Sequence, residues 1–144
     1  MTDATSKRLD EIIASHSRRE GPLLPILHDV QAEFGCVDEA AKRHIALALN
    51  LSRAEVHGVV SFYHDYKAKK AHLPVLKLCR AESCKARGVE ALVAGAEAAA
   101  QGKVEIETIY CLGLCSVGPN AMIGKDVHAR LDAAKLNALI EGIA

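Results

Sequence analysis

Four cysteines are the residues of this chain best suited to chemistry. They stand as two close pairs in the segments CRAESC and CLGLC, namely Cys79 with Cys84 and Cys111 with Cys115. Gaps of four and three residues let each pair of thiolates converge on one tetrahedral ion, and two irons joined by sulfides make a 2Fe-2S cluster. The spacing therefore predicts one 2Fe-2S centre with these four cysteines as ligands.

Zinc binding, disulfide bonds and free thiols are the alternatives for these cysteines. Four thiolates also suit zinc, although C-x2-C knuckles are more typical of structural zinc sites. The first residues, MTDATSKRLDEII, contain no apolar signal segment, and no apolar run approaches the roughly 20 residues that cross a bilayer. We therefore expect a cytoplasmic chain without membrane insertion, in which disulfides are disfavoured. Cys36, which belongs to neither pair, is expected to be a small packed side chain.

The composition gives no electrostatic reason to bind nucleic acid or an acidic membrane. The 144 residues include 18 Lys and Arg and 18 Asp and Glu, so the chain is formally neutral. Half of the residues are hydrophobic but only 3% are aromatic, and Trp is absent. The core must therefore consist of Ala, Leu, Val and Ile, which suits helices packed on one another or on a small sheet.

Residues 1–70 predict a bundle of four short amphipathic helices. Gly35 suits the left-handed end of the second helix, which Gly21 and Pro22 open. Asp38 is a predicted N-cap of the third helix, and Ser52 with Glu55 makes a capping box for the fourth. The predicted apolar stripes are Leu9, Ile12, Ile13 and His16; Leu23, Ile26, Leu27, Val30 and Phe34; Ala41, Ile45 and Ala48; and Val56, Val59, Val60 and Tyr63.

Residues 71–144 predict a second domain that alternates strands and helices. Apolar periodicity is lost over 64–74, so the boundary falls there. Strands are expected at 75–78, 104–110, 121–123 and 127–131, and helices at 85–101 and after Asp132, with Leu136, Leu139, Ile140 and Ile143 as the last stripe. The order β-α-β-β-β-α indicates a small sandwich with both cysteine pairs on loops at strand ends.

The residues around the cysteines suggest how a cluster would be stabilised. Gly113 would let the backbone approach the iron and donate N–H groups. Cys84 lies at the start of a predicted helix, where the helix dipole favours a thiolate. Basic side chains nearby would offset the negative charge of a cluster or, equally, form a solvated or docking surface; they are Lys77, Arg80, Lys85 and Arg87.

Three parts of the sequence resemble the small 2Fe-2S subunit of NADH dehydrogenases, the family of the 24-kDa subunit of complex I. The first is the pair of cysteine motifs with their spacing, the second is the segment VHGVVSFYHDY, and the third is the segment YCLGLCSVGPNAMI around the second motif. The resemblance extends from about Leu9 to Ile143. It implies an α+β protein with an N-terminal helical bundle followed by a thioredoxin-like 2Fe-2S ferredoxin domain. It also implies that one cluster is bound by Cys79, Cys84, Cys111 and Cys115.

The resemblance further implies partners rather than an independent active site. Members of this family dock on a flavoprotein subunit that carries FMN and the NAD site, beside a larger catalytic subunit. The chain has no G-x-G-x-x-G after a predicted strand, and His57 and His64 are expected to be packed or solvated rather than catalytic. We expect an electron-transfer subunit of an NAD-dependent oxidoreductase that carries out no hydride transfer itself.

Within the family, the sequence is most similar to the gamma subunit of soluble NAD-dependent formate dehydrogenases. The segments CRAESCKARGVEAL and FGCVDEAAKRHIALALNLSRAEVHGVVSFYH carry this similarity, together with the compact segment between the pairs and the lack of a presequence and a C-terminal extension. The segment Cys36-Val37-Asp38 departs from complex I subunits, which usually have an aromatic residue and then Pro there. Complex I and NAD-linked hydrogenases share the module and are the alternatives.

Two further interpretations concern residues 40–63. The segment AAKRHIALALNLSRAEVHGVV resembles a helix-turn-helix, so a DNA-binding redox sensor is an alternative of another class, although only Arg53 adds positive charge to the opening of the second helix. The pair Phe62-Tyr63 follows a helix whose apolar face is already filled. One ring is expected either to anchor a partner subunit or to close the chain's own core.

Overall fold

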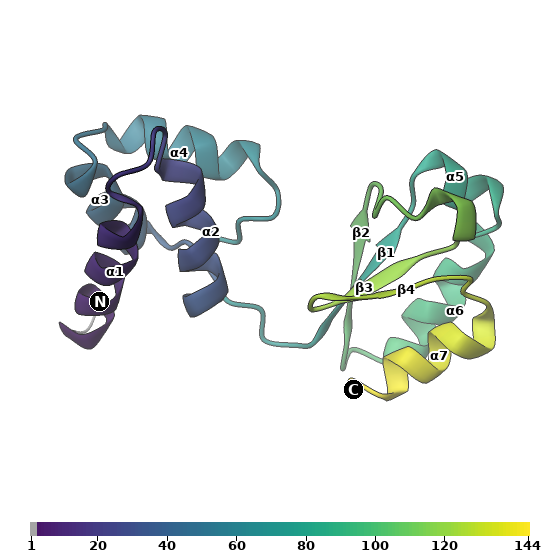
Figure 1. The fold of residues 1–144 in the computed structure, drawn as a ribbon. Helices are drawn as coiled ribbons and strands as arrows, with labels where there is room; N and C mark the ends of the chain where they lie inside the picture. Colours follow the sequence, from purple (N-terminus) through teal and green to yellow (C-terminus); the bar gives the residue numbers. More distant parts are fainter. Residues whose placement is uncertain (1–2) are drawn as a thin grey trace. The chain divides into compact units, whose positions relative to one another are not determined.

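Two compact units make up the protein, for which a computed structural model describes residues 3–144. One unit ends at Lys70 and the other begins at Ala71. The first contains only helices, and the second is a four-stranded sheet with helices (Figure 1). The predicted α+β class with a helical N-terminal region is confirmed.

Several helix ends of the first unit lie where capping chemistry predicts. Its four helices are α1 (Asp3–His16), α2 (Leu23–Phe34), α3 (Glu39–Ala48) and α4 (Arg53–Phe62). Gly35 ends α2 with φ 75°, in the left-handed region. The carboxylate of Asp38 accepts the Ala41 N–H at 2.7 Å, and Ser52 and Glu55 form the reciprocal capping box.

The core of this unit contains the predicted stripes with two corrections. Leu9, Ile26, Leu27 and Val30 are among its fully buried side chains. In α3 the buried alanine after Ile45 is Ala46, whereas the predicted Ala48 is exposed. Tyr63 does not continue the stripe of α4. The helix ends at Phe62, and Tyr63 adopts φ −90° and ψ 103°, so the helical periodicity no longer sets its direction.

The second unit is built on a mixed sheet. Its strands are β1 (Val75–Cys79), β2 (Glu105–Ile109), β3 (Ala121–Ile123) and β4 (Asp126–His128), in the spatial order β2-β1-β3-β4. β1 and β2 are parallel, and the β1–β3 and β3–β4 pairs are antiparallel. Alternate residues of β1, Leu76 and Leu78, are buried in the core, which follows from the two-residue period of a strand.

Helices α6 (Glu90–Ala100) and α7 (Ala133–Glu141) pack side by side and cover the sheet (Figure 1). Ala96 and Ala100 of α6 and Leu136 and Ile140 of α7 complete the core. Buried alanines such as these suit a core that contains few aromatic residues. Among residues 3–144, no helix is long and apolar enough to cross a membrane.

Two predicted elements of this unit differ from the structure. The single helix predicted over 85–101 is divided into α5 (Glu82–Ala86) and α6, because the chain between them turns at Gly88 with φ 89°. The hairpin strand predicted at 127–131 is the shorter β4. The chain leaves the sheet after His128, Arg130 has a positive φ, and the Leu131 N–H bonds to Pro119 O.

Candidate metal centre

The four cysteines predicted as ligands meet at one edge of the sheet. Cys79 is the last residue of β1, Cys111 follows β2, Cys84 lies in α5, and Cys115 begins a short 3-10 helix, η1 (Cys115–Val117). Parallel neighbouring strands have their carboxyl ends at the same edge of a sheet. The pairing of Cys79 with Ile109 therefore brings the two cysteine pairs into one loop cluster.

The sulfurs form two contacts rather than one group of four. Cys111 Sγ and Cys115 Sγ are 3.7 Å apart, and the thiol of Cys84 is hydrogen-bonded to Cys79. Two thiolates on one tetrahedral ion with bonds of about 2.3 Å lie ~3.8 Å apart. Because a 2Fe-2S cluster gives each iron two thiolates, this two-and-two arrangement of four free cysteines fits such a cluster. Within residues 3–144, no three His, Cys, Asp or Glu side chains form a group around one ion.

The two pairs differ in their exposure to solvent. Cys79 and Cys84 are 2% and 1% exposed, whereas Cys111 and Cys115 lie on the surface. Cys79 and Cys84 would hold a cluster from the interior and Cys111 and Cys115 from the surface. An electron-transfer partner would then reach such a cluster from the side of Cys111 and Cys115.

The thiols have different affinities for protons. Burial alone raises the pKa of Cys79, but hydrogen bonds from the backbone N–H groups of Ala81, Cys111 and Leu112 and from the Cys84 thiol outweigh it, so the pKa is lowered. The pKa of Cys84 is raised by its burial and by the neighbouring Cys79. The prediction that Cys84 favours the thiolate is therefore wrong for the chain alone, because α5 is only one short turn and its dipole does not outweigh burial.

Backbone N–H groups surround the sulfurs, as the sequence predicted. Gly113 has φ 79° and donates its N–H to Cys111 Sγ at 3.3 Å. Cys111 itself has φ 82°, which a non-glycine residue rarely adopts and which costs of the order of 1–3 kcal/mol. The positive φ angles on either side of Leu112 aim several N–H groups toward the sulfurs, as in an anion-binding backbone nest.

Two side chains that no sequence pattern indicated hold the loop from Cys111 to Cys115. Asn120 is 1% exposed and donates from Nδ2 to Leu114 O at 2.8 Å and to Cys84 Sγ at 3.8 Å. Ser83 Oγ donates to Cys115 O at 3.0 Å. The proximity of Asn120 to Cys115 in the sequence was the only available signal.

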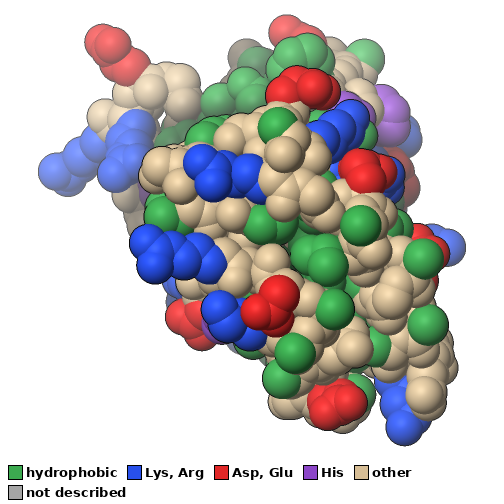
Figure 2. All heavy atoms as spheres, turned by 90° about the vertical axis from the view of Figure 1, so that its right-hand side faces the viewer, with side chains coloured by type: hydrophobic (Ala, Val, Ile, Leu, Met, Phe, Trp, Pro, Cys, Tyr) green, Lys and Arg blue, Asp and Glu red, His purple; other side chains and the backbone are tan. Residues whose placement is uncertain are grey.

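The predicted basic side chains around the cysteines are partly neutralised. Arg80 binds both carboxylate oxygens of Glu90, at 2.9 and 2.5 Å, and Lys85 lies 3.6 Å from Glu82. On the face of the second unit drawn in Figure 2, Lys and Arg side chains are interspersed with Asp and Glu and with hydrophobic side chains. Both signs of charge are therefore available on this face to a partner.

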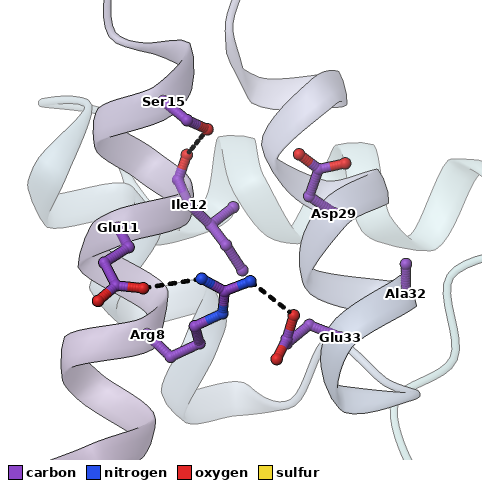
Figure 3. Close-up of a pocket in the computed structure, with 7 residues that line it drawn as sticks. All are labelled: Arg8, Glu11, Ile12, Ser15, Asp29, Ala32 and Glu33. Atoms are coloured by element: carbon purple, nitrogen blue, oxygen red, sulfur yellow. Dashed lines mark hydrogen bonds and ion pairs between the residues drawn. The ribbon is translucent and has the colours of Figure 1, made fainter.

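The first unit contains a cavity of about 370 Å³ between α1 and α2, and no cysteine lines it. Figure 3 shows Arg8 between Glu11 and Glu33, to which it donates at 2.8 and 3.0 Å. These carboxylates raise the pKa of Arg8. The Ser15 hydroxyl donates to the backbone oxygen of Ile12 rather than to a base, so it is not activated as a nucleophile.

Three other residues that the sequence singled out lie in the first unit, namely Cys36, His57 and Asn50. Cys36 is half-buried and far in the sequence from the other cysteines. His57 Nδ1 lies 3.2 Å from the ammonium of Lys42, which is buried and also paired with Glu39. Asn50, with φ 53°, lies in the turn between α3 and α4, and the helix-turn-helix interpretation of this segment stays a prediction.

A domain of this architecture with paired cysteines at the ends of β1 and β2 is that of a small iron-sulfur electron carrier. Residues 9–144 match the family model described as thioredoxin-like 2Fe-2S ferredoxin. The chain belongs to this family, and its cofactor is a 2Fe-2S cluster. The predicted thioredoxin-like ferredoxin domain is thereby confirmed.

Two relatives illustrate the similarity, which extends over most of this chain. One NADH-quinone oxidoreductase subunit of Rhizobium meliloti (strain 1021) is 28% identical, over 94% of this chain and 86% of the relative. NADP-reducing hydrogenase subunit HndA of Solidesulfovibrio fructosivorans is 25% identical, over 90% of this chain and 81% of the relative.

The fold is also similar to part of a solved structure, the air-oxidized NAD+-reducing NiFe hydrogenase. The TM-score is 0.68 with 27% sequence identity, over 84% of this chain. This chain spans only 22% of that hydrogenase chain. These relatives are of the complex I and hydrogenase kinds, which were the alternatives to a formate dehydrogenase subunit.

Proposed function

We propose that this chain is the 2Fe-2S electron-transfer subunit of a multisubunit, NAD-linked oxidoreductase of the complex I or NAD-reducing hydrogenase type. Membership of the ferredoxin family and the similarity to a complex I subunit and a hydrogenase subunit support this proposal. When bound, the cluster accepts and releases one electron at a time. The hydride chemistry then belongs to FMN and NAD on a partner flavoprotein, because a flavin exchanges both single electrons and electron pairs.

The ligands in this proposal are Cys79, Cys84, Cys111 and Cys115. The observation that carries it is the arrangement of their sulfurs as two pairs, with 3.7 Å between Cys111 Sγ and Cys115 Sγ. The N–H groups directed at Cys79 and Cys111 stabilise negative charge on these two sulfurs.

The flavoprotein is proposed to approach the loop from Tyr110 to Cys115. Tyr110 is 73% exposed and Leu114 is 36% exposed, and they flank two cysteines on the surface. Exposed apolar side chains next to a charged centre are typical of an interface that excludes water on docking. The helical unit, residues 1–70, is proposed as a second docking element, with Phe62 as its most exposed aromatic side chain.

A soluble NAD-dependent formate dehydrogenase is the finer proposal for the host enzyme. It rests on the resemblance of the segments around Cys36 and Cys79, whereas the relatives described above favour a complex I or hydrogenase host. Five free thiols suit a reducing compartment, so we propose the cytoplasm as its location. Co-purification of the native complex, followed by assays of NAD reduction with formate and with hydrogen and of NADH oxidation with a quinone, would distinguish the hosts.

Electron exchange through a partner flavin can be tested by stopped-flow spectroscopy. We expect NAD to reoxidise the dithionite-reduced chain rapidly only when the flavoprotein is present. The flavoprotein stripped of its flavin is the matched control and should not restore the reaction. Rapid reoxidation by NAD without any flavin would contradict the proposal, and so would salt-sensitive retention on DNA, which would instead favour a redox sensor.

A further inference from the structure

Asn120 connects three segments that carry the cysteines. Its backbone oxygen accepts the Cys79 N–H at 2.9 Å at the end of β1. Its side-chain Nδ2 reaches Leu114 O at 2.8 Å and Cys84 Sγ at 3.8 Å. Its backbone N–H also lowers the pKa of Cys84 through a hydrogen bond to the sulfur. No other side chain described in the structure bonds both to a cysteine sulfur and to the opposite cysteine loop.

The orientation of the Asn120 amide is set by its surroundings. Leu114 O can only accept a hydrogen bond, so it requires the NH2 group and excludes the flipped amide. Both N–H groups of Nδ2 then have acceptors, one on Leu114 and one on Cys84. The amide oxygen, in contrast, is buried without a hydrogen-bond partner. Because the amide donates both N–H groups and its oxygen accepts no hydrogen bond, the amide directs positive partial charge at the Cys84 sulfur and can stabilise negative charge there.

We propose that Asn120 is a positioning residue that raises the reduction potential of the centre through its N–H bond to Cys84. Reduction adds a negative charge to the cluster and its thiolates, and a buried N–H donor stabilises the charge more after reduction than before. The bond to Leu114 keeps the amide in place for this role. The inference rests on the proposed ligand set, in which Cys84 binds iron.

Ser83 provides a matched control for this role. Like Asn120, it holds the loop between the cysteines, since Ser83 Oγ donates to Cys115 O at 3.0 Å. It makes no described hydrogen bond to a sulfur. Ser83→Ala therefore removes one side-chain bond to the loop and leaves the donors to the sulfurs unchanged, whereas Asn120→Leu removes both kinds of bond at similar side-chain volume.

The test is a redox titration of the purified, cluster-loaded chain, followed by EPR, for wild type, Asn120→Leu, Asn120→Ala and Ser83→Ala. Iron and sulfide are measured first in each. We expect loaded Asn120 variants in which the ratio of reduced to oxidised cluster at a fixed potential falls about tenfold, which is ~59 mV for a one-electron couple. Ser83→Ala should change this ratio less than twofold.

Three results would overturn the inference. They are an unchanged ratio in loaded Asn120 variants, an equal shift in Ser83→Ala, and loss of the cluster from both Asn120 variants, which would mean a purely structural role. Failure of the proposed function has a different signature, because it would appear in the stopped-flow experiment with the flavoprotein and not in the potentials of the Asn120 variants. A wild-type chain without iron and sulfide would contradict the ligand set on which the inference rests.

Discussion

Replacing Gly118 by alanine is expected to weaken cluster binding through Cys84. Gly118 has φ −66° and ψ 167°, which alanine adopts without strain, so only the added methyl group matters. A Cβ at this position would lie 3.1 Å from Cys84 Sγ and 3.2 Å from Arg87 Cδ. Since ordinary van der Waals contacts begin at 3.4 Å, the sulfur must move by a few tenths of an ångström.

The two neighbours of that methyl group differ in their freedom to move. Arg87 Cδ belongs to a flexible side chain, but Cys84 Sγ is fixed once it binds iron. Metal–ligand distances keep within about 0.2 Å of their ideal values, so the displacement exceeds what the bond tolerates. Overpacking of this kind costs about 1–3 kcal/mol, which corresponds to roughly one to two orders of magnitude in cluster retention.

The assay is the rate of cluster loss to an iron chelator, followed by visible absorption. Gly95→Ala is the matched control, because Gly95 lies inside α6 and an added Cβ would meet nothing within 4 Å. This control should raise the free energy of unfolding by about 0.5–1 kcal/mol and leave cluster loss unchanged. If Gly118→Ala released its cluster at the wild-type rate, the proposed position of Cys84 Sγ at the iron would be refuted.

Three further predictions concern the capping, the ion pairs and the docking of the two units. Ser52→Ala removes the capping box of α4 and should lower the free energy of unfolding of the helical unit by about 1 kcal/mol, seen as a lower urea midpoint at unchanged slope; no change in midpoint would contradict the capping role. The Arg80 guanidinium holds the pKa of the Glu90 carboxyl below its ordinary value of 4.5. The ion pair therefore stabilises the fold fully above pH 4.5, and this stabilisation is lost as the pH falls through the lower pKa of the folded state. Glu90→Gln should therefore lower the thermal midpoint at pH 7, with the loss shrinking as the pH falls below 4.5, and a loss independent of pH would disprove the ion-pair contribution. Phe62→Ser, at a side chain that is 73% exposed, should change the stability by less than about 0.5 kcal/mol yet reduce co-purification with the flavoprotein, and a variant that unfolds whenever it dissociates would show that Phe62 has no separate docking role.

Local chemistry explains why much of the fold could be predicted from the sequence. Asp38, Gly35 and the Ser52–Glu55 box fix helix ends through contacts within three or four residues, so the sequence alone determines them. The division of the helix predicted over 85–101 was missed, because the sequence does not reveal that Gly88 adopts a positive φ and turns the chain there.

The structure brings together the four cysteines that the sequence predicts as ligands, and their binding of a cluster stays a prediction, whereas the side chains that hold them in place could not be predicted. The spacing of the cysteine pairs indicates a metal centre without any structure. The role of Asn120 depends on contacts with Cys84 and Leu114, of which the first spans 36 positions in the sequence, and no periodicity or motif reports such a contact. The positive φ of Cys111 and its backbone hydrogen bond to Cys79 are likewise features of the folded loop that no motif reports.

The most direct test of the proposed cluster site is iron and sulfide analysis with EPR of the anaerobically purified chain and its five single Cys→Ser variants. We expect two irons and two sulfides in the wild type and in Cys36→Ser, with identical visible and reduced EPR spectra. Serine at Cys79, Cys84, Cys111 or Cys115 should abolish or strongly alter both spectra. A chain that contained only zinc, or a Cys36→Ser variant that lost its cluster, would contradict the proposed ligand set.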